Sequence, residues 1–382
     1  MKNVLIVAQA ITQDYLDVLT AALGSAIHVD VMTGSKISGN VICSPKHDPR
    51  SLRTRFECWF RHYRFVNRWM RKNRQKKYDL IFMVSNPPIN SYIGLKLKKQ
   101  FQAPVLYMNW DLYPQCIEYM IKNPIAQFIC RLWHGWNSRN YPKIDKILTI
   151  GNIIAESINK DLKQKVDIGV IPIAVDTKRL KPIRKEENPF CREHGLTEDF
   201  VVLYSGKMGY GHNIELILEA AEKLKEHSKI RFVFIGEGPK YALAEQFVKE
   251  HGLNNTLLFP LQPEDVFPFS MACGDVGIVS QESSMAQLFM PSKTYSMMAC
   301  GMAIVGICSG HDDLQQLIST SCCGEVIDRP DSDMLADVLL HVYQNRELLE
   351  KYQKNALHVV RNKYARNVVV RQYADMFRNY LR

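Results

Sequence analysis

The chain has 382 residues, of which 46% are hydrophobic and 10% aromatic, and its formal net charge at pH 7 is +10. This composition is that of an ordinary soluble globular protein, and a chain of this length usually forms two domains. No apolar run approaches the length of a bilayer-spanning helix, so the sequence excludes a membrane-spanning protein.

The first apolar run is interpreted as a β-strand and not as an export signal. Val4–Ala8 is too short for the apolar core of a signal peptide, and Gln9, Gln13 and Asp14 follow it at once. The ten cysteines show no paired CxxC spacing and are expected to be reduced thiols of a cytosolic protein. No set of Cys and His has the spacing of a zinc site.

Strands and helices alternate along the first half of the chain. The predicted strands are 4–8, 28–32, 80–84, 105–108, 146–150 and 169–173, and the predicted helices are 15–23, 93–101 and 155–162. Such alternation favours an α/β fold built on a doubly wound parallel sheet.

The second half repeats this pattern. Its predicted strands are 200–204, 230–235, 257–259, 276–279 and 303–307, and its predicted helices are 214–226, 241–251 and the amphipathic 366–382. Proline residues 172, 182 and 189 and a run of charges interrupt the pattern, so the two domains are expected to join near 173–189. Residues 1–180 carry a net charge of about +14 and the remainder about −4, which suggests different partners for the two halves.

Residues 50–77 form a basic and aromatic stretch with one acid, Glu57. The pattern suits a helix on an anionic membrane surface, and it also fits a solvated helix that packs aromatic side chains into the core. Nucleic acid is a third possible partner. We favour the membrane.

Two polar segments of the first half follow predicted strands. Ser85 and Asn86 end the strand 80–84, and Asp111 follows the strand 105–108. Asp111 is either a turn or cap carboxylate or a polar group aimed at a reacting hydroxyl.

Glycine-rich loops follow two predicted strands of the second half. The first contains Gly206, Lys207, Gly209 and Gly211, and the second is Gly236–Pro239. Glycine allows a tight turn and a close approach of backbone to a ligand, although such turns also occur without one. Parallel α/β sheets bind ligands at the carboxyl ends of their strands, where these loops are expected to lie.

A third loop of this kind precedes a helix that starts at Ser292 and Lys293 and ends before Gly301. Unpaired backbone N–H groups, the positive end of the helix dipole and a lysine side chain together favour a phosphate. This segment predicts a nucleotide diphosphate site. His212 lies in the first glycine-rich loop and His311 in the segment 309–313, and each is either a ligand contact or a structural residue.

Taken together, these segments resemble the retaining glycosyltransferases of family 4. The resemblance covers nearly the whole chain and rests on the strand end 85–88, Trp110-Asp111-Leu112-Tyr113-Pro114, Val170-Ile171-Pro172 with Val175-Asp176, Ser205–Gly209, Gly236–Pro239, Pro291-Ser292-Lys293, Ala299-Cys300-Gly301, Gly324, Pro330-Asp331 and the final helix. It looks most like the bacterial branch that builds capsule, exopolysaccharide or O-antigen units.

The resemblance implies the GT-B fold, with two Rossmann-like domains facing a cleft. Residues 1–180 would bind the acceptor, with helix 366–382 packed back on them, and residues 181–365 would bind the nucleotide sugar. The enzyme would transfer a hexosyl or N-acetylhexosaminyl group, with retention, to a saccharide on a polyprenyl diphosphate. It would be cytoplasmic and peripherally bound to the inner face of the membrane through residues 50–77.

The resemblance also implies roles for individual residues. Asp111, Lys207 and Lys293 would be catalytic, without a metal or other cofactor. The donor would contact Gly206, Gly236, Glu237, Gly238, Glu282, Ser292, Thr294 and Ser296, with the N–H groups of Ser292 and Thr294 supporting its diphosphate. Gln9, Ser85 and Asn86 would lie on the acceptor side.

The sequence departs from the family pattern in two places. Counting back from Gly301, the paired glutamates of many members fall on Ser296 and Leu288, and Glu282 is a possible substitute for the ribose-binding one. The loop after the first strand, Gln9–Thr12, has no glycine. Two other interpretations stay open: a nucleotide-sugar 2-epimerase of the same fold, and a two-lobed sugar-binding protein that is not an enzyme.

Overall fold

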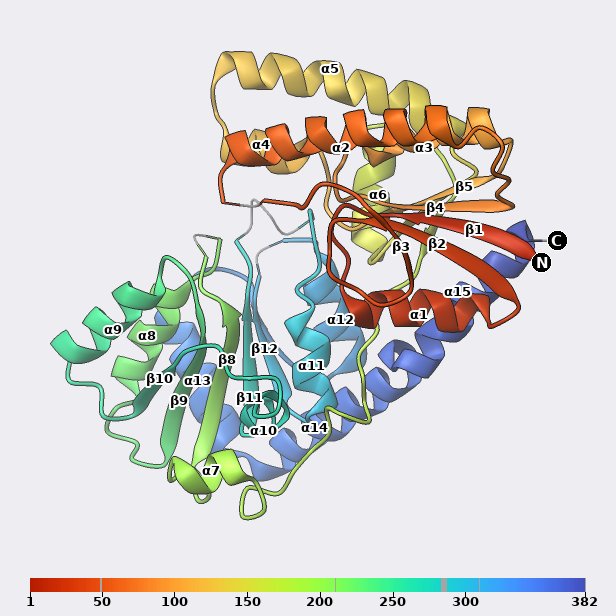
Figure 1. The fold of residues 1–382 in the computed structure, drawn as a ribbon. Coiled ribbons are helices and arrows are strands. Elements are labelled where there is room, and N and C mark those ends of the chain that lie inside the picture. Colours follow the sequence, from red (N-terminus) through yellow and green to blue (C-terminus); the bar gives the residue numbers. More distant parts are fainter. Residues whose placement is uncertain (49, 210, 283–286, 309, 382) are drawn as a thin grey trace. The chain divides into compact units, whose positions relative to one another are not determined.

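The structure is a computed structural model that describes residues 1–48, 50–209, 211–282, 287–308 and 310–381 (Figure 1). The chain divides into two compact units. Unit 1 comprises Met1–Ala174 with Asn367–Arg382, and unit 2 comprises Val175–Arg366. Each unit is built on one sheet in which all paired strands are parallel.

Unit 1 contains a seven-stranded sheet in the order β3-β2-β1-β4-β5-β6-β7. Its strands are β1 (Lys2–Val7), β2 (Ile27–Thr33), β3 (Asn40–Cys43), β4 (Leu80–Val84), β5 (Val105–Asn109), β6 (Lys146–Thr149) and β7 (Ile168–Val170). Its helices are α1 (Gln13–Leu23), α2 (Leu52–Lys72), α3 (Asn90–Phe101), α4 (Gln115–Met120), α5 (Pro124–Asn140), the 3-10 turn η1 (Tyr141–Lys143), α6 (Asn152–Lys160) and α15 (Arg366–Tyr380).

Helices cover both faces of this sheet. In Figure 1, α1 and α15 lie on one side, and α2 and α3 lie on the other. The Tyr15 and Tyr373 hydroxyls are 2.9 Å apart, and the Phe82 and Phe377 rings are 5.6 Å apart between centroids. These contacts hold the C-terminal helix α15 against α1 and β4.

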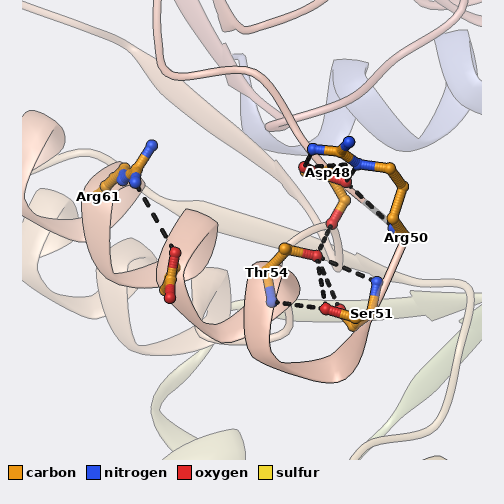
Figure 2. Close-up of polar contacts among 6 residues, drawn as sticks. Asp48, Arg50, Ser51, Thr54 and Arg61 are labelled. Carbon is orange, nitrogen blue, oxygen red and sulfur yellow. Dashed lines mark hydrogen bonds and ion pairs between the residues drawn. The ribbon is translucent and has the colours of Figure 1, made fainter.

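Side-chain hydrogen bonds hold the first turn of the long helix α2. Ser51 Oγ accepts a hydrogen bond from the Thr54 N–H at 3.1 Å, and Thr54 Oγ1 accepts one from the Ser51 N–H at 3.1 Å (Figure 2). This reciprocal pair is a capping box, which satisfies two backbone donors at the start of a helix. Arg50 forms an ion pair with Asp48 at 2.6 Å just before it.

Unit 2 contains a six-stranded sheet in the order β10-β9-β8-β11-β12-β13. Its strands are β8 (Phe200–Lys207), β9 (Ile230–Glu237), β10 (Thr256–Phe259), β11 (Val276–Ser280), β12 (Ala303–Ile307) and β13 (Gly324–Ile327). Its helices are α7 (Pro189–Glu193), α8 (Ile214–Lys223), α9 (Tyr241–Glu250), α10 (Phe267–Met271), α11 (Lys293–Ala299), α12 (Asp313–Ser321), α13 (Ser332–Gln344), α14 (Arg346–Val359) and the π turn η3 (Val360–Tyr364).

Both sheets reverse their strand order at one place. In unit 1 the reversal lies between β1 and β4, and in unit 2 it lies between β8 and β11. The expectation of two Rossmann-like, doubly wound parallel sheets is confirmed. Loops at the carboxyl ends of the strands that flank such a reversal diverge, and ligands of open α/β sheets bind there.

Candidate functional site

The carboxyl ends of β8 and β9 form the first part of the candidate site in unit 2. Gly206 pairs with Gly236, and Lys207 pairs with Glu237, in the parallel ladder. A Cβ on Gly236 would lie 1.9 Å from the Gly206 carbonyl oxygen. The sequence analysis expected these four residues in loops. They instead belong to the strands, because the two glycines have no side chains and let β8 and β9 stay paired as far as Lys207 and Glu237.

The backbone stays close beyond the ladder as well. Met208 N–H donates to the Glu237 carbonyl at 2.8 Å, and Lys240 N–H donates to the Met208 carbonyl at 3.1 Å. Gly238 has φ +136°, and a Cβ there would lie 2.6 Å from the Met208 oxygen. The two loops are therefore fixed against each other, with the Lys207 and Glu237 side chains exposed.

Lys293, the first residue of α11, extends its side chain toward this strand end. Its Nζ lies 3.9 Å from the centroid of the Tyr204 ring and 4.0 Å from the place of a Cβ on Gly206. Among the described residues, this buried nitrogen has no hydrogen-bond partner. A buried ammonium without a partner is costly, so the arrangement favours an incoming anion.

The pKa of Lys293 reflects this burial. Desolvation lowers the pKa of its ammonium from 10.5 to about 7. The pKa of the neighbouring His212 is also lowered, first by burial and then by the charge of Lys293. His212 is therefore neutral at pH 7, and its Nδ1 donates to the Ser280 carbonyl at 3.0 Å.

The start of α11 differs in detail from the prediction. Ser292 is the exposed residue that precedes the helix, and its side chain makes no capping hydrogen bond. The Thr294 N–H donates to the Pro291 carbonyl at 3.1 Å, so it is already used and does not point freely at a ligand. The buried Thr294 Oγ1, in contrast, has no hydrogen-bond partner among the described residues.

The end of β11 brings in Glu282. Asn213 N–H donates to the Ser280 hydroxyl at 3.0 Å, and Glu282 N–H donates to the Gly211 carbonyl at 3.3 Å. Glu282 is partly buried and its charge acts on His212. Ser296 is also partly buried, on α11. Residue 210 of the glycine-rich loop lies outside the described residues.

The acceptor-side residues lie at the strand-order reversal of unit 1. The Gln9 N–H donates to the Asn86 carbonyl at 2.6 Å. Gln9 is fully buried, and its Nε2 donates to the Pro45 and Cys58 carbonyls at 3.2 and 3.1 Å. Ser85 is also buried and its hydroxyl accepts from the Trp110 N–H at 3.0 Å. Of the three predicted residues, only Asn86 is partly exposed.

Asp111 follows β5 and is exposed. Nearby protein atoms nonetheless surround the carboxyl itself, and this desolvation raises its pKa, while the charge of Arg55 partly opposes the rise. Its neighbour Trp110 packs on Tyr15, with ring centroids 4.7 Å apart. Asp111 is thus a carboxylate on an anchored turn, next to a cation from α2.

The remaining candidate from the sequence is His311. His311 is exposed and lines a pocket of about 570 Å³ at the start of α12, together with Gln315 and Asp328.

Within the described ranges, no three or more His, Cys, Asp or Glu side chains gather as they would to hold a metal ion. No described helix is long and apolar enough to cross a membrane.

Two residues of these sites were missed by the sequence analysis. Tyr204 supplies the ring face beside Lys293, and Arg55 supplies the charge near Asp111. Each is far in sequence from its partner and carries no motif. Only the strand order, which brings β8 and the start of α11 together, reveals the first pair.

Known proteins resemble this chain in both sequence and fold. Residues 189–359, which lie inside unit 2, match the family model described as "Glycosyl transferases group 1". The crystal structure of Anabaena HepE in complex with UDP superposes with a TM-score of 0.76 at 13% identity, covering 99% of this chain and 100% of that one. The chain has the GT-B fold.

Two bacterial relatives match in sequence. "Putative colanic acid biosynthesis glycosyl transferase WcaI" of Escherichia coli is 29% identical over 178 residues, which are 47% of this chain and 43% of that protein. "Probable glycosyltransferase WbjE" of Pseudomonas aeruginosa is 27% identical over 259 residues, 66% of this chain and 63% of that protein. The matches thus span less than two thirds of either relative's length.

Proposed function

We propose that this protein is a glycosyltransferase that uses a nucleotide diphosphate sugar in the synthesis of a bacterial surface polysaccharide. The family match over residues 189–359, the two relatives and the fold shared with a UDP-bound protein support the proposal. Retention of configuration and a polyprenyl-diphosphate-linked saccharide acceptor are the finer parts of it, and these rest on the resemblance to family 4.

The observation that carries the proposal is the environment of Lys293. Its buried Nζ has no hydrogen-bond partner among the described residues, and it lies beside Gly206 at the strand-order reversal of unit 2. A diphosphate would supply the missing negative charge. Lys207, exposed at the end of β8, would be the second cation. Developing charge on a leaving group is stabilised best by groups that are already in position.

In the proposed reaction, the bond between the sugar C1 and the diphosphate oxygen breaks, and a bond from C1 to an acceptor hydroxyl oxygen forms. The acceptor proton leaves with the nucleoside diphosphate or the solvent. Lys293 and Lys207 would stabilise the departing diphosphate, with Ser292 and Thr294 beside it. Asp111 would orient the acceptor or the sugar near C1, and Glu282 would hold the ribose in place of the glutamate missing at Ser296.

We further propose that transfer needs no metal, because the lysines carry out the charge neutralisation. The protein would act in the cytoplasm at the inner face of the membrane, held there in part by the basic helix α2. Asn86 is the acceptor-side residue best exposed to a ligand. Gln9 and Ser85 would shape that side through the backbone groups that they bind.

A nucleotide-sugar 2-epimerase remains the second candidate, since it has the same fold. It would convert the donor without an acceptor. Incubation with a nucleotide sugar alone therefore separates the two functions.

Thermal unfolding with UDP, GDP and the corresponding monophosphates tests the donor site. A ligand that binds only the native state raises the melting temperature by mass action. We expect a rise with one nucleoside diphosphate and a smaller rise with its monophosphate, and both should be lost in Lys293→Ala. The absence of any rise with every nucleotide diphosphate would refute the proposed donor site.

A further inference from the structure

Helix α5 of unit 1 exposes a continuous apolar stripe. Ile125, Phe128, Ile129 and Leu132 are 75%, 56%, 54% and 61% exposed. Their spacing of three and four residues places them on one face of the helix. Large apolar side chains are common singly on protein surfaces, but four on one helical face form a patch that needs a partner.

The opposite face of α5 is fixed to the rest of unit 1. Cys130 is buried in a small core cluster with Trp59 of α2 and Ile117 of α4. The Trp133 ring packs on Trp59 and Tyr113, with centroids 6.5 and 6.1 Å apart. The exposed stripe is therefore held outward by a packed inner face.

Further apolar side chains lie on the helices that contact α5. Phe56 and Phe60 of α2 are exposed, as is Met120 at the end of α4. Phe56 contacts Trp59, the residue that joins α2 to α5, at 4.9 Å between ring centroids. In Figure 1, α5 runs alongside α2 on the outer side of that helix.

Basic side chains predominate around the stripe, and the acids Glu118 and Asp161 lie against His134 of α5, at 3.1 and 3.6 Å. Lys122 and Arg131 are exposed next to the stripe, and α5 contains no Asp or Glu. On α2, exposed Arg61 and Arg64 accompany the phenylalanines, with the Arg64 guanidinium 5.7 Å from the centroid of the Phe60 ring. Glu57, the acid of this helix, already pairs with Arg53 and Arg61 at 3.1 and 3.8 Å.

We infer that the α5 stripe inserts into the interface of an anionic lipid bilayer, while the arginines of α2 hold the headgroups. An apolar helical face flanked by cations is the pattern of interfacial membrane helices. A second copy of this chain is a poor partner for the same surface, because two positively charged patches repel. The inference deepens the proposed membrane association and, for its biological meaning, rests on the proposed function.

The two contributions predict different salt dependence. Attraction by α2 weakens as salt screens it, whereas apolar insertion persists. Wild-type protein should bind vesicles of equimolar phosphatidylcholine and phosphatidylglycerol, and a salt-resistant part of that binding should remain. Vesicles of phosphatidylcholine alone should bind it more weakly.

Vesicle sedimentation of the full chain without nucleotide tests the inference. The double variant Phe128→Ser with Leu132→Ser should lower vesicle binding at least about tenfold at every salt concentration. Leu243→Ser with Leu261→Ser, two exposed leucines of unit 2, is the matched control and should bind as wild type does. Arg61→Glu with Arg64→Glu should remove the salt-sensitive part.

A second measurement guards against a variant that fails to fold. Phe128→Trp adds an indole within the stripe, and its extra fluorescence should shift to the blue and be quenched by brominated lipid chains. Wild-type binding by the Phe128→Ser, Leu132→Ser variant, or no quenching of the added indole in Phe128→Trp, would overturn the inference. So would a concentration-dependent dimer that the two serine substitutions abolish.

The melting-temperature rise with UDP or GDP is measured on the same variants. Loss of vesicle binding with nucleotide binding intact supports the α5 surface and the donor site together. Vesicle binding through α5 in a protein that binds no nucleotide diphosphate would leave this inference standing and refute the proposed function.

Discussion

The Lys293 ammonium lies 3.9 Å from the centroid of the Tyr204 ring, at the carboxyl end of β8. The negative face of the ring stabilises the ammonium without forming a hydrogen bond. The cation is thus held in place while its N–H donors stay available. Burial lowers its pKa to about 7, so its charge state depends on what binds beside it.

Removal of the Lys293 amine should reduce turnover strongly. Lys293→Ala is expected to cost about 2–4 kcal/mol of transition-state stabilisation, as for the loss of one preorganised oxyanion donor. Steady-state kinetics with a nucleotide sugar measures this. Lys225→Ala, at an exposed lysine of unit 2, is the control, and near-wild-type turnover of Lys293→Ala would contradict the assignment.

Donor affinity should fall as pH rises through about 7. The diphosphate of UDP-glucose does not titrate in this range, but it favours the protonated form of Lys293. Above pH 7 the free protein must therefore take up a proton on binding. Titration calorimetry in buffers of different ionisation enthalpy should detect this uptake in the wild type and not in Lys293→Met. Equal pH profiles for both proteins would exclude the coupling.

The same pKa shift should affect stability without ligand. Between about pH 7 and 10.5 the unfolded state carries the proton and the folded state does not. Because the unfolded state then binds more protons, the contribution of Lys293 to stability rises with pH across this window. The melting temperature of the wild type relative to Lys293→Met should therefore increase from pH 7 to 10. A constant difference would show that the ammonium is not desolvated.

The paired glycines at the ends of β8 and β9 should tolerate no side chain. A Cβ on Gly236 would overlap the Gly206 oxygen at 1.9 Å, so the strands would have to separate. We expect Gly236→Ala to destabilise unit 2 by about 1–3 kcal/mol, measured by urea unfolding. Gly209→Ala is the control, because the nearest atom to its new Cβ is 3.7 Å away.

Asp111→Asn should separate chemistry from donor binding. The amide keeps the shape of the carboxyl and removes its charge, so turnover should fall about 100-fold or more. Since Asp111 lies in unit 1 and the proposed diphosphate site in unit 2, the melting-temperature rise with nucleotide diphosphate should persist. Unchanged turnover would leave Asp111 as a turn carboxylate only.

If the Glu282 carboxylate holds the ribose, Glu282→Gln should weaken the binding of UDP and change the binding of 2′-deoxy-UDP much less. The loss of a hydrogen bond to a charged group is expected to cost about 1.5–3 kcal/mol. Glu245→Gln, at an exposed glutamate of α9, is the matched control and should leave both affinities unchanged. Equal losses for the two nucleotides would place Glu282 elsewhere in the site.

The strands were predictable from sequence because their signal is local. β4 is an uninterrupted apolar run with all five residues buried, and its predicted bounds match the structure. β3 was missed because it is a short edge strand, Asn40–Cys43, with no residue fully buried and therefore no strong apolar pattern.

Helix α5 shows where the local signal fails. Ile125, Phe128, Ile129 and Leu132 have helical periodicity but face outward, whereas Cys130 and Trp133 form the packed inner face. Periodicity in the sequence identifies a helix with one apolar face. Which side of the helix is covered, and by which elements, follows only from the way α2 and α4 pack against it.

The candidate site was predictable in composition and not in geometry. The apolar pattern of the sequence located the strands, and with them the glycines and Lys293 that come after those strands. The contact of Lys293 with Tyr204 depends on the register of the sheet and on the direction of a side chain, neither of which a spacing contains. The hydrogen bond from Thr294 N–H to Pro291, which uses one of the predicted donors, is also invisible in the sequence.

Unit 2 starts and ends at neighbouring points of the backbone. Val175 N–H donates to the Tyr364 carbonyl at 2.9 Å, and Arg366 N–H donates to the Val175 carbonyl at 3.0 Å. A segment whose two ends lie side by side can be cut out or inserted with little rearrangement of its host. Residues 175–366 therefore form a natural cassette. If unit 2 binds the donor as proposed, exchanging these residues between relatives should transfer donor preference as one piece while the host keeps its own acceptor.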